Sequence, residues 1–268
     1  MVFHETCIRV LAQQALECAC SAKKVKLTLA LPAHDGVKQP ALALQPQVGQ
    51  PAKPMLVAPK HLPTRSVQSA QGRGMLLHAL AHIEFNAINL ALDLIVRFAN
   101  MPAQFYLDWL KVAQEEAHHH QLLCQRLQTY GVVYGDYPAH NGLWEVATKT
   151  QTSLLARLAL VPRLHEARGL DACPAIREKL AQAGALESAH ILDIILRDEI
   201  GHVEIGNYWY NALCQAEHKD PIAEFERCLR DYDVPLPRSP FNYEARKQAG
   251  FSEQELVWLQ QLEAKQNA

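Results

Sequence analysis

The sequence predicts an all-α protein whose centre is a bundle of four long helices. In four long stretches, apolar residues recur every three or four positions, and Gly and Pro gather between these stretches. Residues 131–150 separate the second stretch from the third and contain only a short helical pattern. Such a connection suits a crossover along a bundle, because twenty extended residues span roughly 60 Å and a 26-residue helix is roughly 40 Å long.

Composition and charge indicate a folded protein without a broad basic surface. The chain has 268 residues, 49% of them hydrophobic, and a formal net charge of −2. This balance gives no strong signal for nucleic acid or for an anionic membrane. A small-molecule substrate, with oxygen or peroxide, is the partner class that the candidate site described below would suit. No stretch of transmembrane length escapes polar interruption.

The cysteines and the N-terminus indicate a cytoplasmic location. Seven cysteines are an odd number, and no pair has Cys-x-x-Cys spacing, which argues against a disulfide framework or a zinc knuckle. The first residues lack both a basic start and an uninterrupted apolar stretch, so we expect no export signal.

Residues 1–72 are predicted to form an N-terminal helix and a Pro-rich arm that pack on the bundle. The helix covers about residues 4–24 and is amphipathic. Seven prolines between residues 31 and 64 forbid a long helix there and favour an extended path. Apolar residues within this arm favour an ordered wrap over a free tether.

Residues 73–219 are predicted to form the bundle, and residues 220–268 a helical C-terminal extension. The four long helices are expected at 73–99, 103–130, 152–170 and 185–219, with a short connecting helix at 174–183. Pro162 should kink or interrupt the third helix. In the extension, a helix starts at Pro221, and a capping box formed by Ser252 and Glu255 opens the last helix.

A repeated pair of residues provides the candidate chemistry. Glu199 and His202 are three positions apart, so both can point to one side of a helix. Glu116 and His119 repeat this spacing. Each pair follows a lone glutamate on an earlier helix: Glu84 precedes Glu116 by 32 residues, and Glu166 precedes Glu199 by 33. The near-equal spacing indicates an internal repeat of helix pairs.

The four glutamates lie on otherwise apolar helical faces. A carboxylate taken out of water costs several kcal/mol unless it is compensated, and four together would repel one another. Two divalent cations would neutralise them, with the two histidines completing a six-ligand site as in ferritin-like bundles. The predicted ligands of the two metal ions are Glu84, Glu116, His119, Glu166, Glu199 and His202.

The second helix offers alternative ligands. Glu115 and His118 form the same motif one position earlier, but their helical face is largely polar, so Glu116 and His119 are preferred. His120 lies about 40° from Glu116 on the helical wheel and is a substitute ligand. Glu115 and Asp198 precede the two motif glutamates and are expected to accept hydrogen bonds from the metal-binding histidines of the opposite half.

The ligand set resembles that of ferritin-like di-iron carboxylate proteins. The sequence around these ligands resembles more closely one bacterial ferritin-like family, domain of unknown function 455. This resemblance runs from the N-terminal helix to about residue 215. The resemblance implies a ferritin-like four-helix bundle and iron. The stretches that carry it are His78–Glu84, Glu115–His119, Glu166–Asp171 and Asp198–Val203.

Several nearby polar residues have structural interpretations. His82 points roughly opposite Glu84 on the helical wheel, so we expect it to pack or to form hydrogen bonds. Arg168 and Asp171 are expected to form a structural ion pair. A local basic surface is conceivable on the third helix and the helix after it, from Arg157, Arg163, Arg168, Arg177 and Lys179.

Two classes of function follow from this site. The first is a non-haem di-iron oxidoreductase that activates oxygen or peroxide and oxidises a substrate that the sequence does not name. A tRNA-modifying hydroxylase is a variant of this class. The second is a non-catalytic metal-binding or iron-handling protein. Manganese is an alternative to iron, because the same ligands suit both metals.

Overall fold

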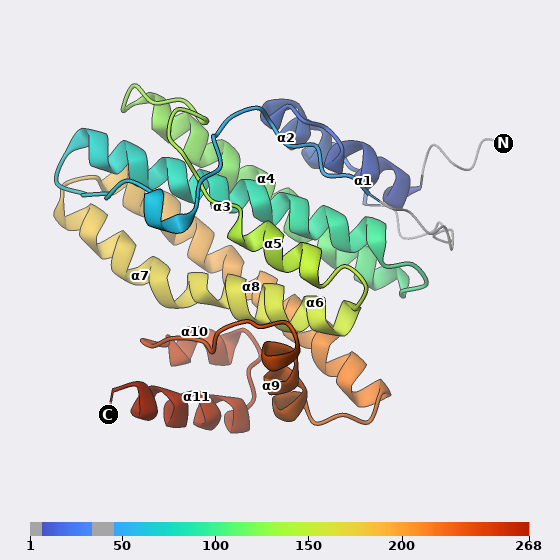
Figure 1. Cartoon of the computed structure of the whole chain (residues 1–268). Helices are drawn as coiled ribbons and strands as arrows, with labels where there is room; N and C mark the ends of the chain where they lie inside the picture. Colours follow the sequence, from blue (N-terminus) through green and yellow to red (C-terminus); the bar gives the residue numbers. More distant parts are fainter. Residues whose placement is uncertain (1–6, 34–45, 268) are drawn as a thin grey trace. The chain divides into compact units, whose positions relative to one another are not determined.

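The computed structural model describes residues 7–33 and 46–267, and helices dominate this part of the chain. The described residues form no strand, although Leu56 and Ala139 make one isolated bridge. This confirms the all-α prediction. The chain divides into two compact units, Met1–Trp144 and Glu145–Ala268 (Figure 1). The division falls within helix α5, Gly142–Lys149.

The first unit is built around two long helices that pack against each other, α3 and α4 (Figure 1). Helix α3 spans Ala70–Arg97, and the Ser69 side chain caps it by accepting a hydrogen bond from the Gly72 amide. Helix α4 spans Ala103–Gln128, and Gly131 follows it with a φ of 68°, a conformation that favours glycine. Both helices lie close to their predicted ranges, and the short break between them makes them antiparallel.

The N-terminal part contains two helices instead of the single one predicted for residues 4–24. Helix α1 spans Ile8–Leu16 and packs on α3, whereas α2 spans Ser21–Leu29 and packs on α4. The break allows each helix to bury its own polar anchor. Arg9 donates hydrogen bonds to the carbonyls of Ile95 and Val96 near the end of α3. Lys24 donates to the side chain of Asn89 and to the Gly49 carbonyl.

The described part of the Pro-rich arm is held by backbone hydrogen bonds. The amide of Val57 donates to the Ala139 carbonyl at 2.8 Å, and the Ala139 amide donates to Met55 at 3.0 Å. A short 3₁₀ helix, Pro59–His61, follows. These bonds agree with an ordered wrap for residues 46–64, whereas residues 34–45 of the arm lie outside the described ranges.

The second unit contains α6 (Leu154–Leu160), a π-helical turn (Val161–Glu166), α7 (Ala167–Gln182) and α8 (Leu186–Ala216). The separate helix expected at 174–183 is wrong, because α7 continues through Pro174. A proline cannot donate to the carbonyl four residues before it. Here that carbonyl, of Leu170, accepts a hydrogen bond from the Asn242 side chain at 3.2 Å instead.

Pro162 widens the helix into the π-helical turn, where the sequence predicts a kink or interruption. Its ring lies so close to α8 that a Cβ atom added to Gly206 would be 2.5 Å from the Pro162 Cβ. Only glycine therefore permits this approach. The unit is completed by α9 (Pro221–Asp231), α10 (Tyr243–Gln248) and α11 (Glu253–Gln266), the last opened by the predicted capping box.

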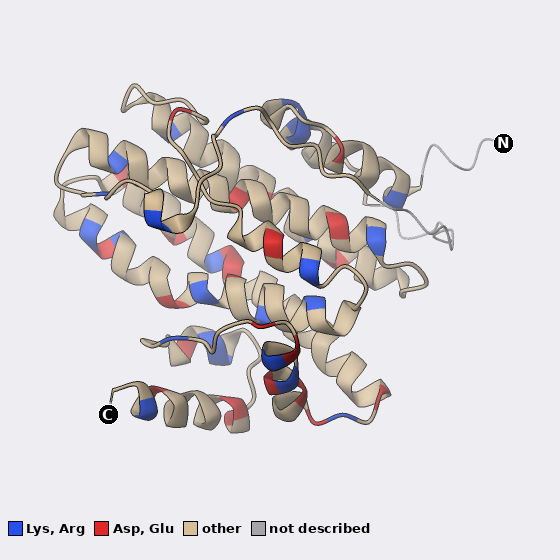
Figure 2. Cartoon of the chain, in the orientation of Figure 1, with Lys and Arg blue, Asp and Glu red and all other residues tan. Residues whose placement is uncertain are grey.

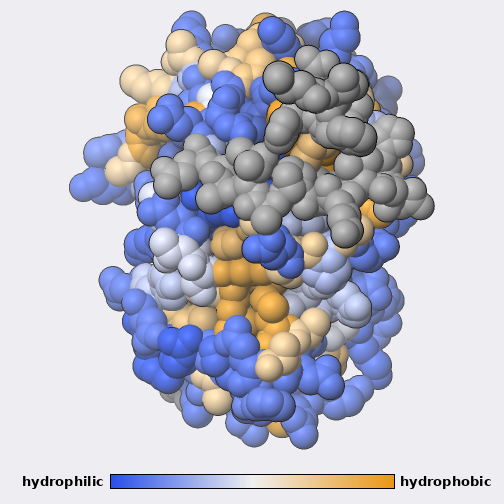
Figure 3. All heavy atoms as spheres, turned by 90° about the vertical axis from the view of Figure 1, so that its right-hand side faces the viewer, coloured by the Kyte–Doolittle hydropathy of each residue, from blue (hydrophilic) through white to orange (hydrophobic). Residues whose placement is uncertain are grey.

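Charged residues lie mainly on the outside of both units. Between Arg73 and Asp93, Glu84 is the only Asp, Glu, Lys or Arg in α3 (Figure 2). Helix α3 is long and apolar enough to cross a membrane by composition, but 83% of its most apolar window is buried within the protein. Figure 3 shows a face on which hydrophilic residues surround a smaller apolar area.

Two of the five basic residues considered for a local basic surface are buried, Arg157 and Arg163, whereas Arg168 and Lys179 are exposed. Arg157 is buried and donates to the Thr150 hydroxyl and to the Ala147 carbonyl. Arg163 is also buried. Both side chains are enclosed by protein groups, so they are not available to a nucleic-acid backbone.

Candidate metal centre

The helix pair α3–α4 brings together three of the predicted ligands in the first unit. Glu84 lies in the middle of α3, and Glu116 and His119 lie on one side of α4. The Nδ1 atom of His119 is 3.2 Å from Oε2 of Glu84 and 3.6 Å from Oε2 of Glu116. One ligand atom from each of these residues lies within 4.8 Å of the others. Two carboxylates and one imidazole thus converge on one point.

Burial supports the register chosen for the motif on α4. The side chains of Glu116 and His119 are fully buried, and Glu84 is only 4% exposed. By contrast, His118 is exposed. Glu115 is partly exposed and lies 4.0 Å from Lys111 on the same helix. Glu115 and His118 are therefore less buried than Glu116 and His119, which form the convergent group.

Burial and mutual contact shift the pKa values of the group. Burial and the nearby Glu116 carboxylate raise the pKa of Glu84 to about 8, although His119 opposes this shift. Burial alone would lower the pKa of His119, but hydrogen bonds to Glu116 and Glu84 outweigh it and raise the pKa to about 11. The two carboxylates thus disfavour each other's ionisation and stabilise positive charge between them, whether on the protonated His119 or on a bound metal ion.

His120 lies beside this group but already has hydrogen-bond partners for both ring nitrogens. Its Nδ1 donates to the Ala81 carbonyl at 2.8 Å, and its Nε2 is 3.4 Å from the Cys124 thiol. Burial raises the pKa of that thiol to about 12, so the thiol stays protonated and donates. In this arrangement, neither ring nitrogen of His120 is available to a metal.

His82 and His78 serve the packing of the loop after α4. His82 is within hydrogen-bond distance of the Tyr134 hydroxyl and of the His140 carbonyl. His78 accepts a hydrogen bond from the Gly135 amide at 2.8 Å. The prediction that His82 packs or forms hydrogen bonds is confirmed.

The second unit holds the other three predicted ligands. Glu199 and His202 are buried on α8, with Oε1 of Glu199 3.9 Å from Nδ1 of His202. The other oxygen of Glu199 is buried and makes no hydrogen bond to the described residues. Glu166 is the last residue of the π-helical turn and is partly buried. Asp198 pairs with Arg197 at 2.8 Å.

The chemistry of these groups suits a hard or borderline divalent ion. Carboxylate and imidazole are the ligands that iron and manganese share, and the described residues bring no thiolate into the first unit's group. The buried Glu84–Glu116–His119 cluster can therefore bind a metal ion. In the second unit, Glu199 and His202 repeat the same pairing of acid and imidazole at helical spacing.

Three polar residues of the second unit have roles that the sequence did not reveal. Arg163 and Asn207 are buried and joined by a hydrogen bond of 2.8 Å, and Glu255 forms an ion pair with Arg163 as well as capping α11. The capping box is a local motif that the sequence shows, whereas the ion pair joins residues 92 positions apart, so the sequence reveals only one of the two functions of Glu255. Arg163 lies just after Pro162, which is the only local sign of an unusual helix.

Comparison with known proteins gives the family but no activity. The family described as "Protein of unknown function (DUF455)" matches residues 9–257. The chain belongs to this family. The match extends well beyond residue 215, where the resemblance was expected to fade, and so includes the C-terminal helices. An uncharacterized protein of Haemophilus influenzae is 48% identical over 220 residues, which cover 80% of this chain and 76% of the relative. No solved structure matches the chain.

Proposed function

We propose that this member of the DUF455 family is a ferritin-like protein with a two-metal centre, and that it uses oxygen or peroxide to oxidise a substrate. The observation that carries the proposal is the buried convergence of Glu84, Glu116 and His119 in the first unit. A protein gains little from burying two neighbouring carboxylates unless a cation compensates them.

The repeat in the sequence supports the second half of the centre. Glu166, Glu199 and His202 follow the first three ligands at an offset of 82 or 83 residues. In a ferritin-like bundle, such a repeat places both ligand sets in the interior between facing helices. We propose that Glu166, Glu199 and His202 bind the second metal ion, with Glu115 and Asp198 orienting the histidines.

Each kind of residue at the proposed centre would have its own role. Metal ions held there would supply Lewis acidity and, for iron, electrons for the reduction of the oxidant. The four carboxylates would balance the charge of the ions, and the two histidines would hold each ion in place. The apolar side chains around Glu84, such as Leu77, Ala81 and Ile88, are fully buried and would exclude water.

Metal content and reactivity test this proposal. The purified protein should contain up to two iron or manganese ions per chain. After anaerobic loading with ferrous iron, oxygen should change the visible absorption. In the double variant Glu116→Gln/Glu199→Gln, we expect at least a tenfold loss of bound metal, whereas His118→Ala, which changes an exposed histidine, should retain it. Full metal retention in the double variant would overturn the assignment.

The same experiment distinguishes an iron-handling protein from an enzyme. If ferrous iron is oxidised repeatedly and deposited as ferric mineral beyond two ions per chain, the protein handles iron. If oxidation stops at the stoichiometry of the centre and awaits a reductant, the enzyme interpretation is supported. Burial of Arg157 and Arg163 leaves the tRNA-modifying variant with weaker support.

A further inference from the structure

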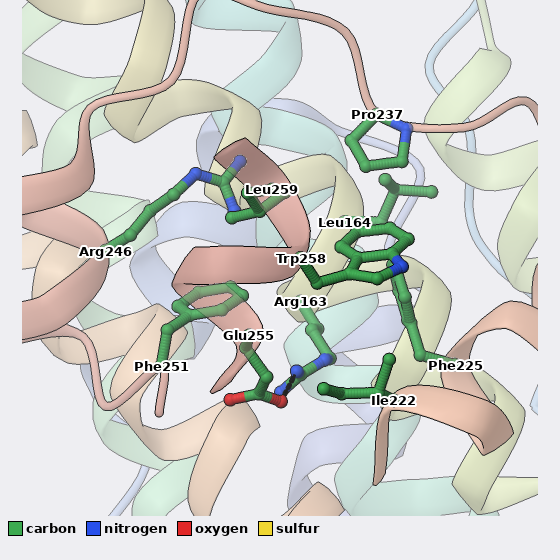
Figure 4. Close-up of a pocket in the computed structure, with 10 residues that line it drawn as sticks. All are labelled: Arg163, Leu164, Ile222, Phe225, Pro237, Arg246, Phe251, Glu255, Trp258 and Leu259. Atoms are coloured by element: carbon green, nitrogen blue, oxygen red, sulfur yellow. Dashed lines mark hydrogen bonds and ion pairs between the residues drawn. The ribbon is translucent and has the colours of Figure 1, made fainter. Parts of the chain in front are cut away.

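A buried arginine links the π-helical turn to the C-terminal helices. Arg163 lies three positions before Glu166 and is 4% exposed. Its guanidinium donates to the Asn207 side chain on α8 at 2.8 Å and to the Glu255 carboxylate on α11. Figure 4 shows Arg163 and Glu255 pointing towards each other. The guanidinium also lies 4.7–5.4 Å from the ring centres of three aromatic residues, Tyr210, Phe225 and Phe251.

A second buried ion pair holds the chain on the other side of Glu166. Arg246 of α10 donates to both carboxylate oxygens of Asp171, at 3.0 and 2.7 Å. The Asn242 amide donates to the same carboxylate at 2.9 Å. The two ion pairs therefore bracket Glu166 in the sequence, three residues before it and five after it. The C-terminal segment supplies the partner in each.

Apolar contacts join the same two parts of the chain. Ala167 and Leu170, which follow Glu166 on α7, share a buried cluster with Val203, which follows His202 on α8. The C-terminal members of the cluster are Phe241, Ala245, Ala249, Phe251, Leu256 and Leu259. The C-terminal helices therefore support residues next to Glu166 and His202.

The cavity beside these arginines is too small for a substrate. It is lined by Arg163, Arg246, Phe251, Glu255 and Trp258 among others (Figure 4), and encloses about 20 Å³. This volume holds about one water molecule. Both guanidiniums are already paired with carboxylates, so the arginines act on the protein itself.

A π-helical turn requires such support because it contains an additional residue. One inserted residue rotates every following side chain by roughly 100° about the helix axis. The direction of Glu166 therefore depends on where the insertion is held. A buried ion pair adds little net stability compared with apolar packing, but it enforces one arrangement of its partners.

We propose that Arg163 is a positioning residue, and that its pairing with Glu255 and Asn207 holds the π-helical turn in the register that aims Glu166. The C-terminal extension thereby controls the second metal position. This inference rests on the proposed function in one respect, namely that Glu166 is a ligand. It assigns a role to residues that contact no metal.

Cobalt(II) titration and hydrogen exchange of the full chain test the inference. Glu255→Gln removes the charge that faces Arg163. Arg163→Lys is a milder change that keeps the charge but loses the forked donors. Glu253→Gln is the matched control, because it removes an exposed carboxylate from the same helix. Cobalt(II) chloride serves as the probe, since its visible bands report coordination without oxygen chemistry.

In both test variants, we expect amide exchange in residues 161–170 to accelerate at least tenfold. The second cobalt ion should bind at least tenfold more weakly, with altered visible bands, and the first should bind as in the wild type. Glu253→Gln should match the wild type in every respect. If amide exchange stays unchanged in folded variants, the pairing of Arg163 does not hold the π-helical turn, and the inference is overturned.

Faster exchange without a change in binding of the second ion would also overturn the inference, since Arg163 would then have a purely structural role. A wild type that binds no cobalt would instead refute the proposed function, and the positioning role with it. A wild type that binds two ions, together with variants that bind the same two equally well, would refute the positioning role alone.

Discussion

The Nδ1 atom of His119 lies 3.2 Å from Oε2 of Glu84, although the two residues belong to different helices and are 35 positions apart. Glu116, one helical turn before His119, approaches the same nitrogen. This contact between α3 and α4 defines the centre of the candidate site.

Replacing Glu84 with glutamine should stabilise the metal-free protein and abolish its stabilisation by metal. Burial and Glu116 raise the pKa of Glu84 to about 8, so the folded metal-free chain must hold this group protonated at neutral pH, and glutamine removes that cost. We expect the metal-free protein to gain about 1–3 kcal/mol in unfolding free energy, and stabilisation by added manganese or iron to be lost. Urea unfolding with and without metal measures both effects. A variant that is less stable without metal and still stabilised by it would contradict this prediction.

Two successive histidines of α4, His118 and His119, should differ sharply in their contribution to metal binding. His119 is fully buried against two carboxylates and His118 is exposed. His119→Ala should reduce bound metal at least tenfold, and His118→Ala by less than twofold. Elemental analysis after identical purification provides the measurement. Equal losses in both variants would show that the register of the motif is wrong.

Lys24 should make the stability of the protein depend on pH. Burial lowers the pKa of this lysine to about 7 in the folded chain, whereas an exposed lysine has a pKa near 10.5. The unfolded chain therefore binds more protons between these values, and the unfolding free energy rises with pH across this window. The slope contributed by one group is at most about 1.4 kcal/mol per pH unit.

In Lys24→Met, the contribution of this lysine to the rise should disappear. Lys23→Met, which changes an exposed neighbour, is the control and should keep the wild-type profile. Urea unfolding at several pH values between 7 and 10 would measure the difference. Parallel pH profiles for the wild type and Lys24→Met would show that the pKa of Lys24 is the same in the folded and the unfolded chain.

Replacing either of two glycines of α8 with alanine should change the stability of the protein, but in opposite directions. A Cβ at Gly206 would lie 2.5 Å from Pro162, whereas a Cβ at Gly201 would meet nothing within 4 Å. Gly206→Ala should therefore destabilise the protein by roughly 2 kcal/mol or more, because the π-helical turn must move. Gly201→Ala should stabilise it by about 0.5–1 kcal/mol through helix propensity. Thermal unfolding of the two variants provides the comparison.

Local patterns in the sequence were sufficient for the long helices α3, α4 and α8 and for the spacing of the candidate ligands. The long helices α3, α4 and α8 follow apolar periodicity, and the last helix begins at its capping box. The burial of Glu116 and His119 follows from the apolar face on which they lie, because a helix fixes which of its residues share one side. The all-α class and the candidate residues were thus available without a structure.

Tertiary contacts decided what those patterns left open. Helix α7 passes through Pro174 because Asn242, far along the chain, satisfies the carbonyl that the proline leaves without a donor. Arg163 is a buried anchor because Glu255 and Asn207 meet it. His120 donates to Ala81 on the neighbouring helix, a partner that no helical wheel displays. Helical periodicity describes one helix at a time, whereas these roles depend on partners that only the packed chain brings together.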